Sequence, residues 1–141
     1  MKEPTKKEIY DSIAHQIERE DSLVNNRINW FLVSQGFFFA AAGVIIDSGL
    51  EKCWKIFATR GIAGIGIIMG VGVLFGLAGA EISISHIKEH WERFENEYAA
   101  YFPPPYGKGC ASIFGCVPRF LIPLVLVVAW AVFLSKLDSL F

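Results

Sequence analysis

The three longest stretches of the chain without a charged residue are 28–46, 61–80 and 120–135. The first two have the roughly 20 residues that a helix needs to cross about 30 Å of hydrocarbon at 1.5 Å per residue. The third is shorter, but Arg119 and Lys136 flank it, and such side chains can extend toward lipid headgroups and lengthen the effective span. The pattern predicts an all-α integral membrane protein with three transmembrane helices, the third over 119–138. A re-entrant or interfacial helix is the alternative for that third run.

The segment before the first run also has a helical pattern. Thr5 and Glu8 have the spacing of a capping box, which satisfies early backbone donors. Five β-branched residues then repeat near helical spacing: Ile9, Ile13, Ile17, Val24 and Ile28. We expect one helix of about 40 residues, with 5–27 outside the membrane.

The segment after the second run has its own apolar stripe. Its members recur at steps of three and four: Ile84, Ile87, Trp91, Phe94 and Tyr98. A helix over 81–101 should therefore pack against 5–27 as an antiparallel hairpin that projects from the bilayer. The prolines at 103–105 should end this helix, leaving 102–118 as a loop or re-entrant segment.

Composition and charge narrow the class of protein. The 141 residues suffice for one domain, and 53% of them are hydrophobic. The net charge of -1 gives no basic field for nucleic acid, so the bilayer is the expected partner. With three spans, nine Lys and Arg residues lie on the same side of the membrane as the N-terminus, and four lie on the opposite side. The positive-inside rule then predicts a cytoplasmic N-terminus.

Glycines crowd the second run. Gly66 with Gly70, and Gly72 with Gly76, have the four-residue spacing that lets helix backbones approach closely in lipid. These glycines occupy more than one helix face, so we expect them to pack a homo-oligomer. Close packing inside one protomer is the alternative.

Polar side chains at the edges of the runs are the candidate site. Arg27 and Glu81 should lie at similar depth and form a boundary ion pair, or a ring of charge at the mouth of an oligomeric pore. Asn29 and Gln35 should either hydrogen-bond between helices or, with Glu81, line a water-filled path.

No enzyme motif is convincing. His86, Glu89 and His90 resemble an inverted zinc-peptidase motif, but the expected third ligand is missing on that side of the membrane. The glycines of the second run lack the preceding strand of a phosphate-binding loop. The three cysteines form no CxxC pair, and the charged N-terminus has no secretory leader pattern. We expect neither catalysis nor a cofactor or metal.

One segment resembles a known group of proteins. Its residues are Glu20, Asn25, Arg27, Trp30 and Gln35, with an Asn-x-Arg-x-x-Trp core. It resembles the first span of small bacterial multi-pass membrane proteins, which implies a location in the bacterial inner membrane. The layout also resembles the membrane accessory and effector proteins of CRISPR and other antiviral systems, which implies pore formation or membrane perturbation. The Arg-x-x-x-x-His motif of several such effectors is absent, so no ribonuclease role carries over.

Two functions follow from these patterns. The first is a homo-oligomeric pore-forming or membrane-perturbing protein. The second is a membrane anchor or adaptor whose hairpin recruits a cytoplasmic protein through Trp91, Phe94 and Tyr98, since aromatic residues are enriched in interface cores. Packing within the hairpin is the alternative role for these three side chains.

Overall fold

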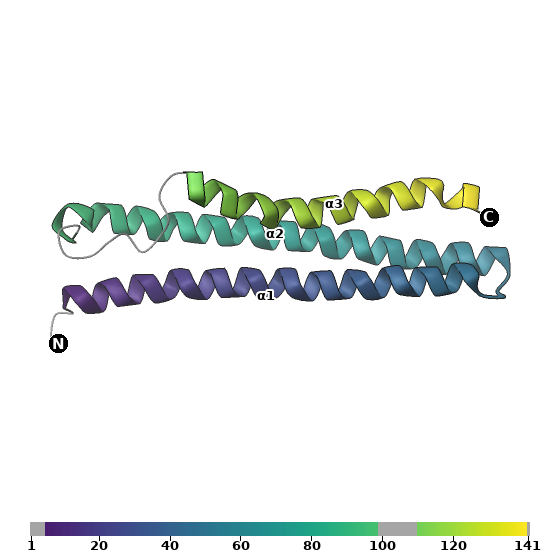
Figure 1. The fold of residues 1–141 in the computed structure, drawn as a ribbon, viewed down its shortest axis with the longest axis horizontal. Helices are drawn as coiled ribbons and strands as arrows, with labels where there is room; N and C mark the ends of the chain where they lie inside the picture. The colour runs from purple at the N-terminus through teal and green to yellow at the C-terminus, as the bar shows by residue number, and fades with distance from the viewer. Residues whose placement is uncertain (1–4, 99–109, 141) are drawn as a thin grey trace.

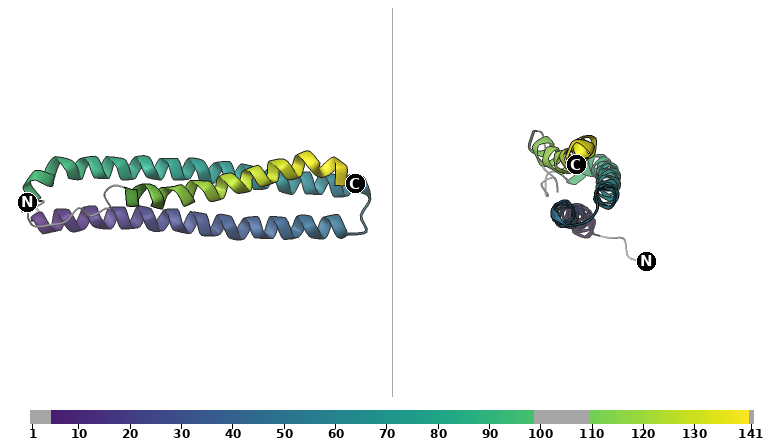
Figure 2. Two further views of the ribbon diagram at one scale, coloured as in Figure 1. Left: turned by 45° about the horizontal axis from the view of Figure 1, so that its top comes forward. Right: turned by 90° about the vertical axis from the view of Figure 1, so that its right-hand side faces the viewer.

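The described part of the chain forms a bundle of three helices that lie side by side along one long axis (Figure 1). The computed structural model describes the backbone of residues 5–98 and 110–140, and the side chains of 5–89, 91–92 and 117–139. The helices are α1 (Lys6–Asp47), α2 (Lys52–Tyr98) and α3 (Cys110–Leu140). α2 packs against both other helices, whereas α1 and α3 meet in few places (Figure 2).

α1 starts at the predicted capping box. The backbone N–H of Thr5 donates to Oε2 of Glu8 at 2.7 Å, and the Glu8 N–H donates to Oγ1 of Thr5 at 3.4 Å. Hydrogen bonding to Thr5 lowers the pKa of the Glu8 carboxyl. The backbone of Thr5 has the larger effect, and its side chain has the smaller one. The helix then runs for 42 residues without a break, which confirms the long helix predicted from the sequence.

One stripe of α1 forms the core of the bundle. Its buried residues are Ile13, Ile17, Val24, Ile28, Phe31, Gln35 and Ala42. They follow each other at steps of three, four and seven, the pattern of a seam between two nearly parallel helices. Near the N-terminus, Ile13 and Ile17 pack on Trp91 of α2. The two predicted apolar stripes therefore do meet in an antiparallel pair.

α3 begins earlier than the sequence predicted. Residues 110–118 were expected in a loop or re-entrant segment, but they form the first turns of α3, which contains Pro118 and Pro123. Proline normally ends a helix because it removes a backbone donor. An apolar segment gains from keeping its other backbone hydrogen bonds internal, so the helix continues through both prolines. The rest of the expected loop, 102–109, lies outside the described residues.

Each helix has a stretch long and apolar enough to cross a membrane: within α1, within Lys52–Glu89 and over Val117–Ser139. Large apolar side chains remain exposed on these stretches, among them Trp30 at 74%, Ile68 at 72% and Phe75 at 75%. Contiguous apolar surface on this scale is rare on soluble monomers. The three helices suggest a multi-pass membrane protein.

Candidate functional site

A hydrogen-bonded node joins all three helices in the middle of their apolar stretches. Gln35 of α1 is 2% exposed, and its Nε2 donates to the Gly66 carbonyl of α2 at 3.4 Å. Its Oε1 accepts a hydrogen bond of 2.6 Å from Nε1 of Trp130 in α3. Each of the three groups is polar and buried, so the contacts satisfy atoms that would otherwise be costly in an apolar interior.

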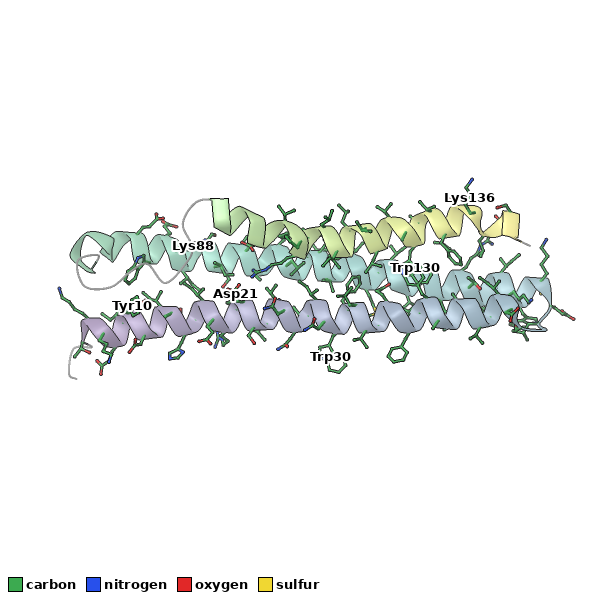
Figure 3. All side chains as sticks on the ribbon, viewed as in Figure 1. Tyr10, Asp21, Trp30, Lys88, Trp130 and Lys136 are labelled. Carbon is green, nitrogen blue, oxygen red and sulfur yellow. The ribbon has the colours of Figure 1, made fainter. Side chains whose placement is uncertain are left out.

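Trp130 fills the space between the helices. It is fully buried, and it stacks on Phe39 with ring centroids 4.1 Å apart and meets Phe133 edge-on at 5.6 Å. Figure 3 shows Trp130 between α3 and the other helices, whereas Trp30 points away from the bundle. A Cβ added at Gly66 would lie 2.6 Å from Nε1 of Trp130. Only glycine at position 66 leaves room for this ring.

The four candidate packing glycines have different surroundings. Gly66 and Gly70 face α3 within the chain, where a Cβ on Gly70 would collide with Cγ2 of Val127. A Cβ on Gly76 would lie 3.9 Å from the Arg27 guanidinium, and one on Gly72 would meet nothing within 4 Å. Two of the glycines thus serve close packing inside the protomer, and Gly72 leaves open space.

The boundary charges make specific contacts. Arg27 Nη1 donates to the Gly76 carbonyl at 3.3 Å. Glu81 Oε1 lies 3.9 Å from Nη1 of Arg119, which is 3.0 Å from Oδ1 of Asp21. Gly76 is five residues, roughly 8 Å, farther into the apolar run than Glu81. A direct pair between Arg27 and Glu81 stays a prediction.

A second ion pair fixes the other end of α3. Nη2 of Arg60 lies 2.7 Å from Oδ1 of Asp138. From Arg119 to Asp138 the helix rises about 28 Å, and from Arg60 to Glu81 about 31 Å. Both values match the ~30 Å thickness of a bilayer's hydrocarbon core. The charges therefore lie at two levels separated by one membrane thickness.

The candidate path-lining residues are spread over the surface and the core. Asn29 is exposed on α1, and the Glu81 side chain is 34% exposed beside Arg119. Gln35 is enclosed and bonded to two other helices, so it does not border open space in this conformation.

The candidate partner contacts lie toward the C-terminal end of α2, beside the N-terminal part of α1. Trp91 is 1% exposed and meets the Tyr10 ring edge-on at 5.6 Å. It packs inside the hairpin and presents almost no surface to a partner. The side chains of Phe94, Tyr98 and His90 lie outside the described residues.

One face of α2 has no neighbour among the side chains that the structure describes. We call it the open seam of α2, and its residues are Gly61, Ile65, Ile68, Gly72, Phe75, Gly79 and Ile82. They follow at alternating steps of four and three, all are exposed, and the three glycines each have nothing within 4 Å of an added Cβ. Large side chains therefore alternate with bare backbone, as knobs alternate with holes in a helix pair.

One face of α1 carries two asparagines and three small residues. We call it the polar strip of α1, and its residues are Asn25, Asn29, Leu32, Gly36, Ala40 and Gly43. They share a face by their spacing of four, three, four, four and three, and all are exposed. Within the apolar run, Asn29 is the polar side chain of this strip, and Leu32 beside it is 40% exposed.

Sequence reasoning missed the role of Trp130 and of Arg119. The tryptophan lies inside an apolar run rather than at its edge, where membrane tryptophans are usually found. That position was a usable signal of a buried hydrogen-bond donor.

Comparison of the chain with models of known protein families, with curated proteins and with solved structures found no match. Its function must therefore be argued from the geometry described above.

Proposed function

We propose that the protein is a homo-oligomeric membrane protein of the bacterial inner membrane that changes membrane permeability. Its N-terminus and its projecting hairpin lie in the cytoplasm. The open seam of α2 carries this proposal, because α3 already occupies Gly66 and Gly70 while the seam meets none of the described side chains. In lipid, association depends on close backbone approach, for which Gly72 and Gly79 are suited.

The polar strip of α1 supplies the surface for a permeant ion or water. Asn29 is the first residue of this strip inside the apolar run, next to the predicted cytoplasmic boundary. Several copies arranged with these strips inward would surround a path whose mouth carries Glu81, which favours cations.

The test is a pair of matched substitutions in the apolar stretches. Gly72→Leu adds bulk to the open seam without meeting any atom of its own chain, so the protomer should fold while the oligomer is lost. Ala131→Leu adds bulk at an exposed position of α3 and serves as the control. Subunit number in nanodiscs and membrane potential in expressing cells are the two readouts.

We expect Gly72→Leu to give a smaller assembly and a normal membrane potential, while Ala131→Leu behaves like the wild type. An unchanged potential on expression of an inserted, oligomeric wild-type protein would rule out the permeability role. Gly70→Leu is unsuitable for this purpose, because it disturbs the packing of α3 within the protomer.

A role in antiviral defence is also part of this proposal. Its support is the layout of the protein, in which long helices leave the membrane and several copies assemble. In that setting another protein supplies the trigger, and the ordered hairpin is the part that receives it.

The second candidate function is a membrane anchor or adaptor. The hairpin favours it, because α1 extends 22 residues, about 33 Å, beyond its apolar run. Trp91 packs inside this hairpin, so a partner would instead bind the charged outer faces, where His15 and Glu18 lie. A partner recovered with a monomeric, non-conducting protein would favour this function.

A further inference from the structure

One face of α1 borders one face of α2 across the predicted membrane boundary, and we call the strip between these two faces the groove. Gln16, Glu20 and Arg27 share one face of α1 at steps of four and seven, and Gly76 and Ser83 share one face of α2 at a step of seven. Two contacts show that these faces border each other. Glu20 and Ser83 line one cavity, and Arg27 donates to the Gly76 carbonyl.

The outer part of the groove is a cavity of about 390 Å³. The cavity is lined by Ile13, Gln16, Arg19 and Glu20 of α1 and by Ser83, His86 and Ile87 of α2. The carboxylate of Glu20 is 18% exposed here, and it lies 3.8 Å from the guanidinium of Arg19. The Arg19 side chain is 72% exposed, so this pair is weak and leaves the carboxylate able to accept further hydrogen bonds.

The inner part of the groove holds a cation. Arg27 is exposed at the edge of the apolar run, and its bond to the Gly76 carbonyl uses one of the five N–H donors of a guanidinium. A charge at that depth is costly unless it pairs or reaches the headgroup layer. Phosphate is the anion present at that depth, and guanidinium binds it with two parallel hydrogen bonds.

The order of the charges defines the ligand. Going outward from the membrane, the groove presents the Arg27 cation and then, seven residues or about 10 Å along α1, the Glu20 anion. Both side chains lean toward the N-terminus of α1, so the separation of the two charged groups stays near this value. A phosphoethanolamine headgroup has the complementary order, with its phosphate inside and its ammonium outside.

We propose that this groove binds a phospholipid with an ethanolamine headgroup. The phosphate contacts Arg27, and the ammonium group contacts Glu20. The inference rests on the proposed membrane placement with a cytoplasmic hairpin, but it requires neither an oligomer nor a pore.

The experiment compares two lipids that share the phosphate and the net charge. Purified protein is delipidated and titrated with dioleoyl-phosphatidylethanolamine or dioleoyl-phosphatidylcholine, whose choline group lacks N–H donors, and bound lipid is counted by native mass spectrometry. We expect the wild type to prefer phosphatidylethanolamine by about tenfold, the effect of one charge-assisted hydrogen bond.

Four variants locate the contacts. Glu20→Gln should abolish the preference, whereas Glu18→Gln, an 80% exposed neighbour outside the cavity, should keep it. Arg27→Gln should weaken binding of both lipids, whereas Lys136→Gln, a basic residue at the other boundary, should not affect the preference. Equal retention of the two lipids by the wild type, or an equal effect of Glu18→Gln and Glu20→Gln, would overturn the proposal.

These outcomes are separable from those of the proposed function. Loss of the lipid preference in a protein that still changes the membrane potential refutes the groove alone. A clear preference in a protein that leaves the potential unchanged refutes the pore alone.

Discussion

The buried Gln35 shows how far a single residue can be interpreted from sequence. A glutamine inside an apolar run must find a hydrogen-bond partner, so contact with another helix was predictable. Its main partner was not, because Trp130 is 95 positions away and reaches Gln35 only through the packing of α3. The same holds for Gly66, whose need for glycine depends on the position of that ring.

This node yields a prediction for Gln35→Leu. The change removes both hydrogen bonds and leaves the buried Nε1 of Trp130 without its acceptor, which should destabilise the bundle by about 1–2 kcal/mol. Reversible unfolding in mixed micelles measures the effect. Trp130→Phe in the same chain removes the orphaned donor, so the double variant should lose less than the sum of the two single changes. Strict additivity would show that the hydrogen bond is not formed.

At the scale of elements, the two long helices followed from local pattern and the third did not. The capping box and the apolar stripes are local signals; the capping box is present at the start of α1, and the stripes of α1 and α2 meet as expected. α3 starts before Pro118 because apolar surroundings favour a continued helix. Local sequence rules, in which proline ends a helix, do not include this effect of the surroundings. Its lateral position depends on Gly66 and Gly70, and the sequence alone left open whether these contact another protomer.

The packing of α3 on α2 predicts opposite outcomes for two neighbouring glycines. Gly70→Ala places a methyl group against Val127 and should destabilise the protomer by about 1–3 kcal/mol. Gly72→Ala meets no atom of the chain and should change protomer stability by less than about 0.5 kcal/mol. Unfolding of monomeric protein in detergent compares them.

Val127→Ala provides the matched control for that comparison. It removes the methyl group that Gly70→Ala would meet, so the double variant should recover part of the lost stability. A Gly70→Ala protein as stable as the wild type would show that α3 does not pack on α2 at this position.

At the scale of the whole molecule, the charged residues form two levels. Arg119, Asp21 and Glu81 lie at one level, and Arg60 and Asp138 lie at the other. The sequence located most of these charges at the ends of apolar runs, but it could not pair them, because each pair joins different helices. The pairing near both ends of the apolar run of α3 aligns that run with the apolar run of α2, between Arg60 and Glu81.

The predicted orientation can be tested with a native thiol. Cys53 is exposed near the start of α2, at the level opposite the hairpin. In a variant with Cys110→Ser and Cys116→Ser, a membrane-impermeant maleimide should label Cys53 in spheroplasts but not in sealed inverted vesicles. Labelling only in the inverted vesicles would reverse the topology and place the hairpin outside the cell.

The unbroken course of α1 and α2 has a mechanical consequence. Neither helix ends at the outer limit of its apolar run, and Val24, Ile28, Leu77 and Ala80 pack the two together across that level. In the proposed membrane placement, α1 would have about 33 Å outside the bilayer and about 28 Å inside it. A sideways force on the outer tip would then reach the embedded part through a helix pair with no break between them.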